Sequence, residues 1–329
     1  MSKALYFRVG MDTGVGGCVA PIFPDSTFEY IPIPDFITTE KYTYSTCKGI
    51  QGEYLSKYLP SHLHDRHPHY DPDFRGEIPV YGDSTTHQKQ VRMLREGDLL
   101  AFYAGLSPWK RWRVRGDIDL YFIGYLVVDE VVVTNIDNVL SQPPNAHTKR
   151  FEHVISLSND ITEKYNMSLA DLIAYYKDNK NREVEEILND LNILKRLSGK
   201  GRVGHSNVKG FRKKLKTMLD KNSWHTFVSS CRKKLVLAAY MHILDTFSQF
   251  TLVKGKSESR LLSKALKLSK RGINKAGSTE NVVSDNWYKI LGIPEGLSLQ
   301  RKNPRFVPNP TYRNKGDYEA LRTELLNAK

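Results

Sequence analysis

The chain has 329 residues, 40% of them hydrophobic and 11% aromatic, and it carries a formal net charge of +13 at pH 7. This length is enough for two domains, or for one large domain with an insertion, and the apolar share is enough for a real core. The three cysteines stand far apart without a CxxC pair, which argues against a zinc knuckle and fits a reducing compartment. No apolar stretch reaches the roughly 18 residues of a membrane helix, so we expect a soluble, cytoplasmic protein with no membrane partner.

The first half of the chain has the pattern of β-strands. Residues 3–9 (KALYFRV) predict a buried strand that runs into a glycine-rich turn at Asp12, and residues 28–33 (FEYIPI) alternate like an exposed or edge strand. Residues 99–106 and 119–133 are apolar and predict two neighbouring strands. We therefore expect an α+β, β-rich fold whose sheet is either a small barrel or a curled mixed sheet.

The stretch from residue 60 to residue 83 is rich in side chains that can bind metal ions or transfer protons. Four of the ten histidines fall within eight residues, and five carboxylates lie among or after them. Imidazoles and carboxylates bind divalent metals or move protons near neutral pH, and Pro68, Pro72 and Pro79 favour a stiff loop over a helix. The candidate catalytic residues are Asp12, His69, Asp71, Asp73, Tyr81 and Asp83, and the candidate ligands for Mg²⁺, Mn²⁺ or Fe²⁺ are His69, Asp71 and Asp73. The alternative is a polar surface loop with no bound ligand.

The middle of the chain changes to a helical period. From residue 168 to residue 250, apolar residues recur at three- and four-residue steps, which predicts several helices. Mixed structure follows, with a strand at 250–255, a short helix that starts at 259–266 and a basic C-terminal arm. We expect three segments: a β-rich domain at 1–150, a basic helical insertion at 151–250, and residues 251–329, which complete the first domain.

The positive charge is concentrated in one part of the chain. Between residues 199 and 275 there are 19 Lys and Arg against three acidic residues, whereas the remainder has 30 basic and 33 acidic residues. Such segregation is typical of a surface that binds a polyanion, because each neutralised phosphate releases counterions. A solvated basic face that serves solubility is the alternative.

These patterns supply candidates for contacts with nucleic acid. The candidate phosphate contacts are Lys213, Lys214, Arg232, Lys233, Lys234, Lys254, Arg260, Arg301 and Arg305. The candidate base-stacking residues are Phe102, Tyr103, Trp109 and Trp112, of which the tryptophans stand among Lys and Arg. Core packing is the alternative for the aromatic residues. The nucleic-acid hypothesis requires that the cations of the helical insertion face the same groove as the histidine-rich stretch.

Several short sequence segments, taken in their order along the chain, resemble a known family. FRVGMDTGVGG, APIFPDSTFEYIPIP, HYDPDF, EGDLLAFYAGL and LYFIGYLVV are similar to the nucleotide modification associated domain 3 family, and FTLVKGKSESRLLSKALKLS and RKNPRFV continue the resemblance near the C-terminus. The resemblance implies a place beside other components of a DNA base-modification or restriction system, and hence DNA in preference to RNA. Residues 97–133 also resemble, more weakly, the small barrels of the PUA, EVE and ASCH type, which implies a pocket for a flipped or single-stranded base.

Three functions are compatible with the sequence. The first is a nucleic-acid-associated protein that binds or processes a modified nucleobase in DNA. The second is a divalent-metal-dependent enzyme that acts on DNA or nucleotides through the histidine-rich stretch. The third is an interaction scaffold without catalysis. The sequence leaves open whether the protein is an enzyme.

Overall fold

The computed structural model describes residues 2–13, 17–35, 41–85, 87–110, 113–114, 117–135, 138–149, 249–273, 277–294, 297, 299, 305–308 and 315–328. The chain divides into two compact units, residues 1–152 with 249–329 and residues 153–248. All elements below belong to the first unit. The predicted helices between residues 168 and 248, with their basic residues, lie outside the described residues.

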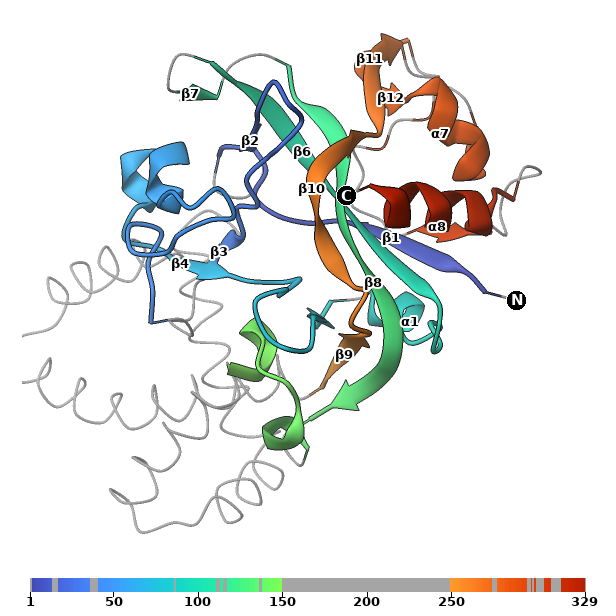
Figure 1. The fold of residues 1–329 in the computed structure, drawn as a ribbon, viewed down its shortest axis with the longest axis horizontal. Coiled ribbons are helices and arrows are strands. Elements are labelled where there is room, and N and C mark those ends of the chain that lie inside the picture. Colours follow the sequence, from blue (N-terminus) through green and yellow to red (C-terminus); the bar gives the residue numbers. More distant parts are fainter. Residues whose placement is uncertain are drawn as a thin grey trace, which may run out of the picture. The chain divides into compact units, whose positions relative to one another are not determined.

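A mixed, curled sheet forms the first unit (Figure 1). Its main path is β13 (Arg305–Val307), β1 (Ala4–Arg8), β6 (Leu99–Lys110), β8 (Asp119–Thr134), β9 (Phe250–Gly255) and β5 (Val80–Asp83). Strands β2 (Ala20–Ile22) and β7 (Arg113–Val114) pair with β6, and β10 (Arg260–Lys267) pairs with β8. Strands β1 and β2 run parallel to β6, while the other pairs are antiparallel. Among the described strands the path does not close, so the prediction of a curled mixed sheet is confirmed and that of a barrel is wrong.

Smaller elements surround this sheet. They are the pairs β3 (Ile33–Asp35) with β4 (His67–His69) and β11 (Ser269–Ile273) with β12 (Thr279–Val283), the helices α1 (Gln88–Val91), α7 (Asp285–Ile290) and α8 (Tyr318–Asn327), and the 3-10 turns η1 (Leu55–Tyr58), η2 (Ser61–Leu63) and η3 (Val139–Ser141). In the part of the chain that the structure describes, no helix is long and apolar enough to span a membrane.

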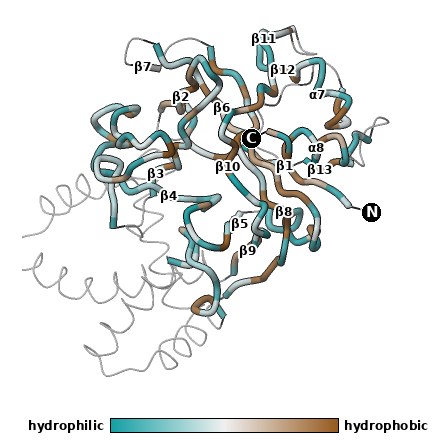
Figure 2. The backbone as a smooth tube through the Cα atoms, in the orientation of Figure 1, coloured by the Kyte–Doolittle hydropathy of each residue, from teal (hydrophilic) through white to brown (hydrophobic). Residues whose placement is uncertain are grey.

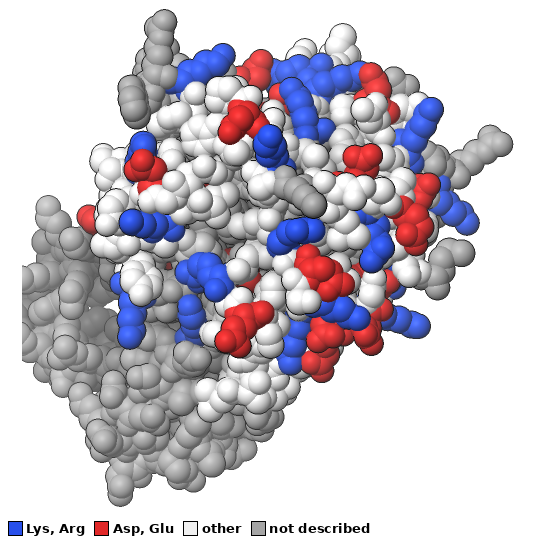
Figure 3. All heavy atoms as spheres, in the orientation of Figure 1, with Lys and Arg blue, Asp and Glu red and all other residues white. Residues whose placement is uncertain are grey.

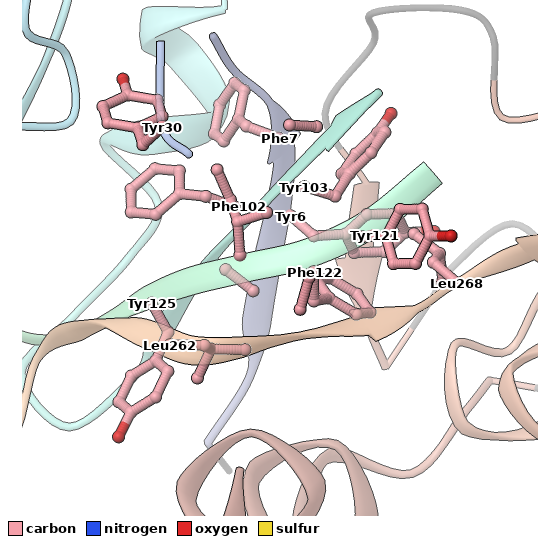
Figure 4. Close-up of a cluster of buried hydrophobic side chains, with 14 of the residues drawn as sticks. Tyr6, Phe7, Tyr30, Phe102, Tyr103, Tyr121, Phe122, Tyr125, Leu262 and Leu268 are labelled. Carbon is pink, nitrogen blue, oxygen red and sulfur yellow. The ribbon is translucent and has the colours of Figure 1, made fainter. Parts of the chain in front are cut away.

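Aromatic side chains on both faces of the central strands form the core. Tyr6 of β1, Tyr103 of β6 and Phe122 of β8 pack against one another in the cluster of Figure 4, and Figure 2 shows hydrophobic residues along these strands. Successive residues of a strand point to opposite faces. Phe102 accordingly contacts Tyr81, with ring centroids 5.4 Å apart, whereas Tyr103 contacts Phe122. Both faces of β6 are covered, so Phe102 and Tyr103 are buried in this structure, and their stacking on a base stays a prediction.

Three expectations about local structure need correction. The segment predicted to begin a helix forms strand β10 (Arg260–Lys267), which pairs with β8. The sequence looked helical because an irregular register between Leu261 and Leu266 leaves Leu262 and Ala265 buried at a spacing of three residues. Residues 28–32 are not an exposed strand, since Phe28 is fully buried and β3 begins only at Ile33. The histidine-rich stretch is not a plain loop, because it contributes η2, β4 and β5.

Candidate functional site

His69 is the last residue of β4, and it stands opposite Ile33 in the antiparallel pair with β3. The imidazole is buried, with its Nδ1 atom 3.2 Å from Oδ2 of Asp35 at the end of β3. A carboxylate can only accept a hydrogen bond, so Nδ1 of His69 carries the proton and donates it. In the neutral imidazole, Nε2 of His69 then carries the lone pair. A carboxylate behind a histidine is the usual support of a metal-binding imidazole.

Asp71 follows two residues later and is held from two sides. Its Oδ1 atom accepts a hydrogen bond of 2.7 Å from the backbone N–H of Gly82 in β5. Its Oδ2 atom lies 3.2 Å from Nε2 of His147. The carboxylate is therefore fixed between the sheet and a histidine that is distant in sequence.

His147 is positioned by a capped turn of helix that follows η3. Oδ1 of Asn145 accepts hydrogen bonds from the backbone N–H groups of His147 and Thr148, at 2.8 and 2.9 Å, and Oγ1 of Thr148 accepts one of 2.7 Å from the N–H of Asn145. This reciprocal arrangement is a capping box. The imidazole stacks on Phe250 of β9, with centroids 5.5 Å apart, and meets the ring of His69 edge-on at 5.1 Å. Both contacts orient its ring toward Asp71.

Together these three residues make a compact centre, hereafter the His–Asp centre (His69, Asp71 and His147). One potential ligand atom from each lies within 4.8 Å of the others. Within the described residues, Nδ1 of His147 and Nδ2 of Asn145 are buried without a hydrogen-bond partner. Buried polar atoms without partners are rare and destabilising, and they are found at functional sites. Two imidazoles and a carboxylate fit a divalent first-row transition metal.

Asp73, the third predicted metal ligand, belongs to a different interaction. Its carboxylate is held by the guanidinium of Arg75, with Nε 2.9 Å from Oδ1 and Nη2 2.6 Å from Oδ2. The carboxylate of Asp73 therefore neutralises a cation, and the third member of the cluster of potential ligands is His147 instead of Asp73. The histidine was missed because it lies 76 residues after Asp71. Asn145 and Thr148, which cap the turn of helix around His147, are the sequence signal that was overlooked.

Tyr81 and Asp83, both predicted to be catalytic, lie on β5 beside the His–Asp centre. Asp83 is buried, and its Oδ1 atom accepts hydrogen bonds of 2.6 Å from the backbone N–H and the hydroxyl of Thr85. Burial, followed by the nearby carboxylates of Asp83 and Asp71, raises the pKa of Tyr81 well above its ordinary value. The phenol thus stays protonated and acts as a hydrogen-bond donor among carboxylates.

Asp12, the remaining catalytic candidate, is separate from the His–Asp centre. Its carboxylate is buried and lies 3.7 Å from Nη2 of Arg8. Asp12 therefore has the guanidinium of Arg8 as its neighbour. It is not one of the three residues of the His–Asp centre.

Only some of the residues predicted to contact nucleic acid lie in the described part of the chain. Trp109 is partly buried against Tyr58, with ring centroids 5.1 Å apart, and Arg260 donates a hydrogen bond of 2.9 Å to the hydroxyl of Tyr125. Arg305 lies on the short strand β13. Outside the described residues lie Trp112, Lys213, Lys214, Arg232, Lys233, Lys234 and Arg301.

Basic residues of the C-terminal strands pair with acids from other elements. The pairs are Lys254–Glu130 (2.9 Å), Lys256–Glu96 (2.7 Å), Lys267–Asp119 (2.6 Å), Lys270–Asp285 (2.6 Å) and Arg271–Asp117 (3.9 Å). Figure 3 shows the same mixture, with Lys and Arg among Asp and Glu over the visible face of the described residues. Charges that are segregated in the sequence are thus partly balanced in space, and Lys254 already has an acidic partner.

Comparison with known proteins identifies the family. The family model described as nucleotide modification associated domain 3 matches residues 3–234. The chain belongs to this family. The range matched to the nucleotide modification associated domain 3 family includes all three residues of the His–Asp centre and much of the unit at 153–248, and it ends before β9. The family name implies a role in nucleotide modification pathways. No curated protein and no solved structure matches the chain.

Proposed function

We propose that this protein is a transition-metal-dependent enzyme that acts on nucleotides, free or within DNA, in a nucleotide modification pathway. The observation that carries the proposal is the convergence of the ligand atoms of His69, Asp71 and His147 within 4.8 Å. Two imidazole ligands favour Mn²⁺ or Fe²⁺ over Mg²⁺, which prefers oxygen ligands and retains its water. Such an ion, when bound, supplies a Lewis acid that polarises an oxygen of substrate or water.

The residues around the ligands have defined tasks in this proposal. Asp35 holds the proton on Nδ1 of His69 and so presents Nε2 as the ligand. Gly82 fixes Asp71 through its backbone N–H. Tyr81, a protonated phenol close to Asp71, is placed to donate a hydrogen bond inside the site.

The other two hypotheses receive less support. A module that stacks a base on Phe102 and Tyr103 conflicts with the burial of both side chains. Phosphate binding by Lys213, Lys214, Arg232, Lys233 and Lys234 stays a prediction, since these residues lie outside the described part of the chain. An interaction scaffold would not need a buried polar centre that costs stability. The partners that we propose are nucleic acid, DNA in preference to RNA, and other components of a modification system.

Metal analysis of the purified protein is the direct test. We expect a stoichiometric amount of Mn or Fe in the wild type, loss of this metal in His147→Ala, and retention in His62→Ala, which removes a histidine outside the centre. Incubation with nucleotides and oligonucleotides, followed by mass spectrometry, should show a product with the wild type and with His62→Ala only. Equal metal content in all three proteins would contradict the proposal.

A further inference from the structure

A small pocket lies beside the His–Asp centre. Its volume is about 220 Å³, and the residues that decide its chemistry are Tyr30, Tyr70, Phe74, Arg75, Lys48 and Ile50. Sites for drug-sized ligands measure roughly 300–1,000 Å³, so this pocket accommodates a single ring system. Pro72, which follows Asp71 directly, also lines the pocket, so the pocket and the centre share one stretch of chain.

The pocket has flat aromatic and cationic surfaces. Tyr30 and Tyr70 are buried, with ring centroids 6.4 Å apart and planes inclined by 66°. The guanidinium carbon of Arg75 lies 3.4 Å from the ring centroid of Tyr70, and the double contact with Asp73 holds the guanidinium in place. Aromatic rings and guanidinium planes are the surfaces on which proteins stack nucleobases.

Polar groups of the pocket are suited to the remainder of a nucleotide. The hydroxyl of Tyr30 is buried and has no hydrogen-bond partner among the described residues. Burial, and then the charges of Asp71 and Asp73, raise the pKa of Tyr30 well above its ordinary value, so this hydroxyl is a donor. Lys48 is exposed at the pocket and contributes a positive charge for a phosphate.

We infer that this pocket binds one nucleobase, with the phosphate of the same nucleotide at Lys48. The inference deepens the proposed function, because it names a single nucleotide unit as the substrate. A free nucleotide and a base flipped out of a DNA strand offer the same ring and phosphate. Pro72 places this ligand beside the His–Asp centre, since it lines the pocket and directly follows Asp71.

Binding titrations with variants of the pocket test the inference. The probes are dAMP, dCMP, dGMP and dTMP, and calorimetry gives the affinity. Ile50→Trp fills the pocket from its exposed edge and should weaken binding about tenfold or more, whereas Ile78→Trp, at a similarly exposed isoleucine outside the pocket, should not change it. Arg75→Lys, which keeps the charge but removes the planar group, should also weaken binding.

Further experiments distinguish binding of the phosphate from binding of the base, and a free nucleotide from a base in a DNA strand. Deoxyribose 5-phosphate should lose its affinity in Lys48→Ala and keep it in Lys89→Ala, a change at an exposed lysine of α1. A single-stranded oligonucleotide that binds where the mononucleotides do not would identify the source as a base in a strand. The inference is overturned if neither probe binds, or if Ile50→Trp binds as the wild type does.

One comparison distinguishes this inference from the proposed function. His147→Ala should lose metal but keep its affinity for the nucleotide, because His147 does not line the pocket. A wild-type protein that binds the nucleotide but contains no metal would overturn only the proposed function. Metal-dependent turnover that is unaffected by Ile50→Trp and Arg75→Lys would overturn only the pocket inference.

Discussion

Nε2 of His147 lies 3.2 Å from Oδ2 of Asp71, although 76 residues separate the two in the chain. The contact forms because β5, which fixes Asp71, and the capped turn that carries His147 meet beside β9. The chemistry of the centre is therefore a property of the tertiary structure, and substitutions that move any of these elements should change it.

Asp35→Asn tests whether the carboxylate behind His69 positions a ligand. The substitution keeps the shape of the side chain but removes its charge, and the affinity for Mn²⁺ should fall about 10- to 100-fold. Competition with a chelator measures this affinity. Asp25→Asn, at an exposed carboxylate that accepts hydrogen bonds from the backbone N–H and the hydroxyl of Thr27, is the matched control and should behave as the wild type. An unchanged affinity in Asp35→Asn would show that this carboxylate does not support the ligand.

Gly82→Ala tests the close approach of β5 to the centre. A Cβ atom at Gly82 would lie 2.5 Å from Cδ2 of His147 and 2.9 Å from Nδ2 of Asn145, so the imidazole has to move. We expect a loss of about 1–3 kcal/mol in the free energy of unfolding, together with weaker metal binding. Gly76→Ala, where the new Cβ would meet nothing closer than 3.7 Å, should leave both quantities unchanged. Equal metal affinities in the two variants would refute the predicted displacement of His147.

Glu29→Gln tests a buried carboxyl group outside the centre. Burial raises the pKa of Glu29 from 4.5 to about 7, although the N–H groups of Ile50, Gln51 and Tyr30 lower it. Between about pH 4.5 and 7 the unfolded chain releases this proton while the folded chain keeps it, so the free energy of unfolding falls as the pH rises. The loss should reach about 3 kcal/mol above pH 7.

Denaturant titrations across this pH range check the prediction about Glu29. Glu29→Gln should lack this decline, because a glutamine stays neutral at every pH. Glu53→Gln should retain it, since Glu53 is a half-exposed residue that pairs with Lys57. The prediction fails if the wild type and Glu29→Gln share the same dependence on pH.

Gly124→Ala tests the assignment of residues 260–267 as a strand. A Cβ atom at Gly124 of β8 would lie 2.9 Å from the backbone oxygen of Arg260 and 3.2 Å from Cα of Leu261. Backbone atoms cannot rotate away, so β10 has to separate from β8, at a cost of about 1–3 kcal/mol. Thermal unfolding measures the change. If the stability is unaltered, the two strands do not pair as described.

The sheet could be predicted from the sequence wherever a strand is a continuous apolar run. Strands β1, β6 and β8 fall in the predicted segments 3–9, 99–106 and 119–133, with β6 extending further. β10 was missed because its bulge breaks the two-residue alternation that distinguishes a strand. The spacing of apolar residues in a sequence reveals a strand only when buried residues alternate regularly, and an irregular strand lacks this alternation.

The site was half predictable for a similar reason. His69 and Asp71 stand in a conspicuous cluster of histidines and carboxylates, so the sequence alone could propose them as candidate ligands. His147 and Asp35 come from segments with no such density, and only the fold brings them to the centre. The aromatic residues of β6 posed the opposite problem, because a core phenylalanine and a base-stacking phenylalanine have the same sequence neighbours.

Strand β9 has a consequence for the order in which the protein is made. Its residue Phe250 supports the ring of His147, and its backbone pairs with β5, which holds Asp71. During translation His69 and its partner Asp35 emerge early, whereas the contacts that hold His147 and β5 cannot form until β9 has emerged. The His–Asp centre can therefore be complete only after more than three quarters of the chain has been synthesised.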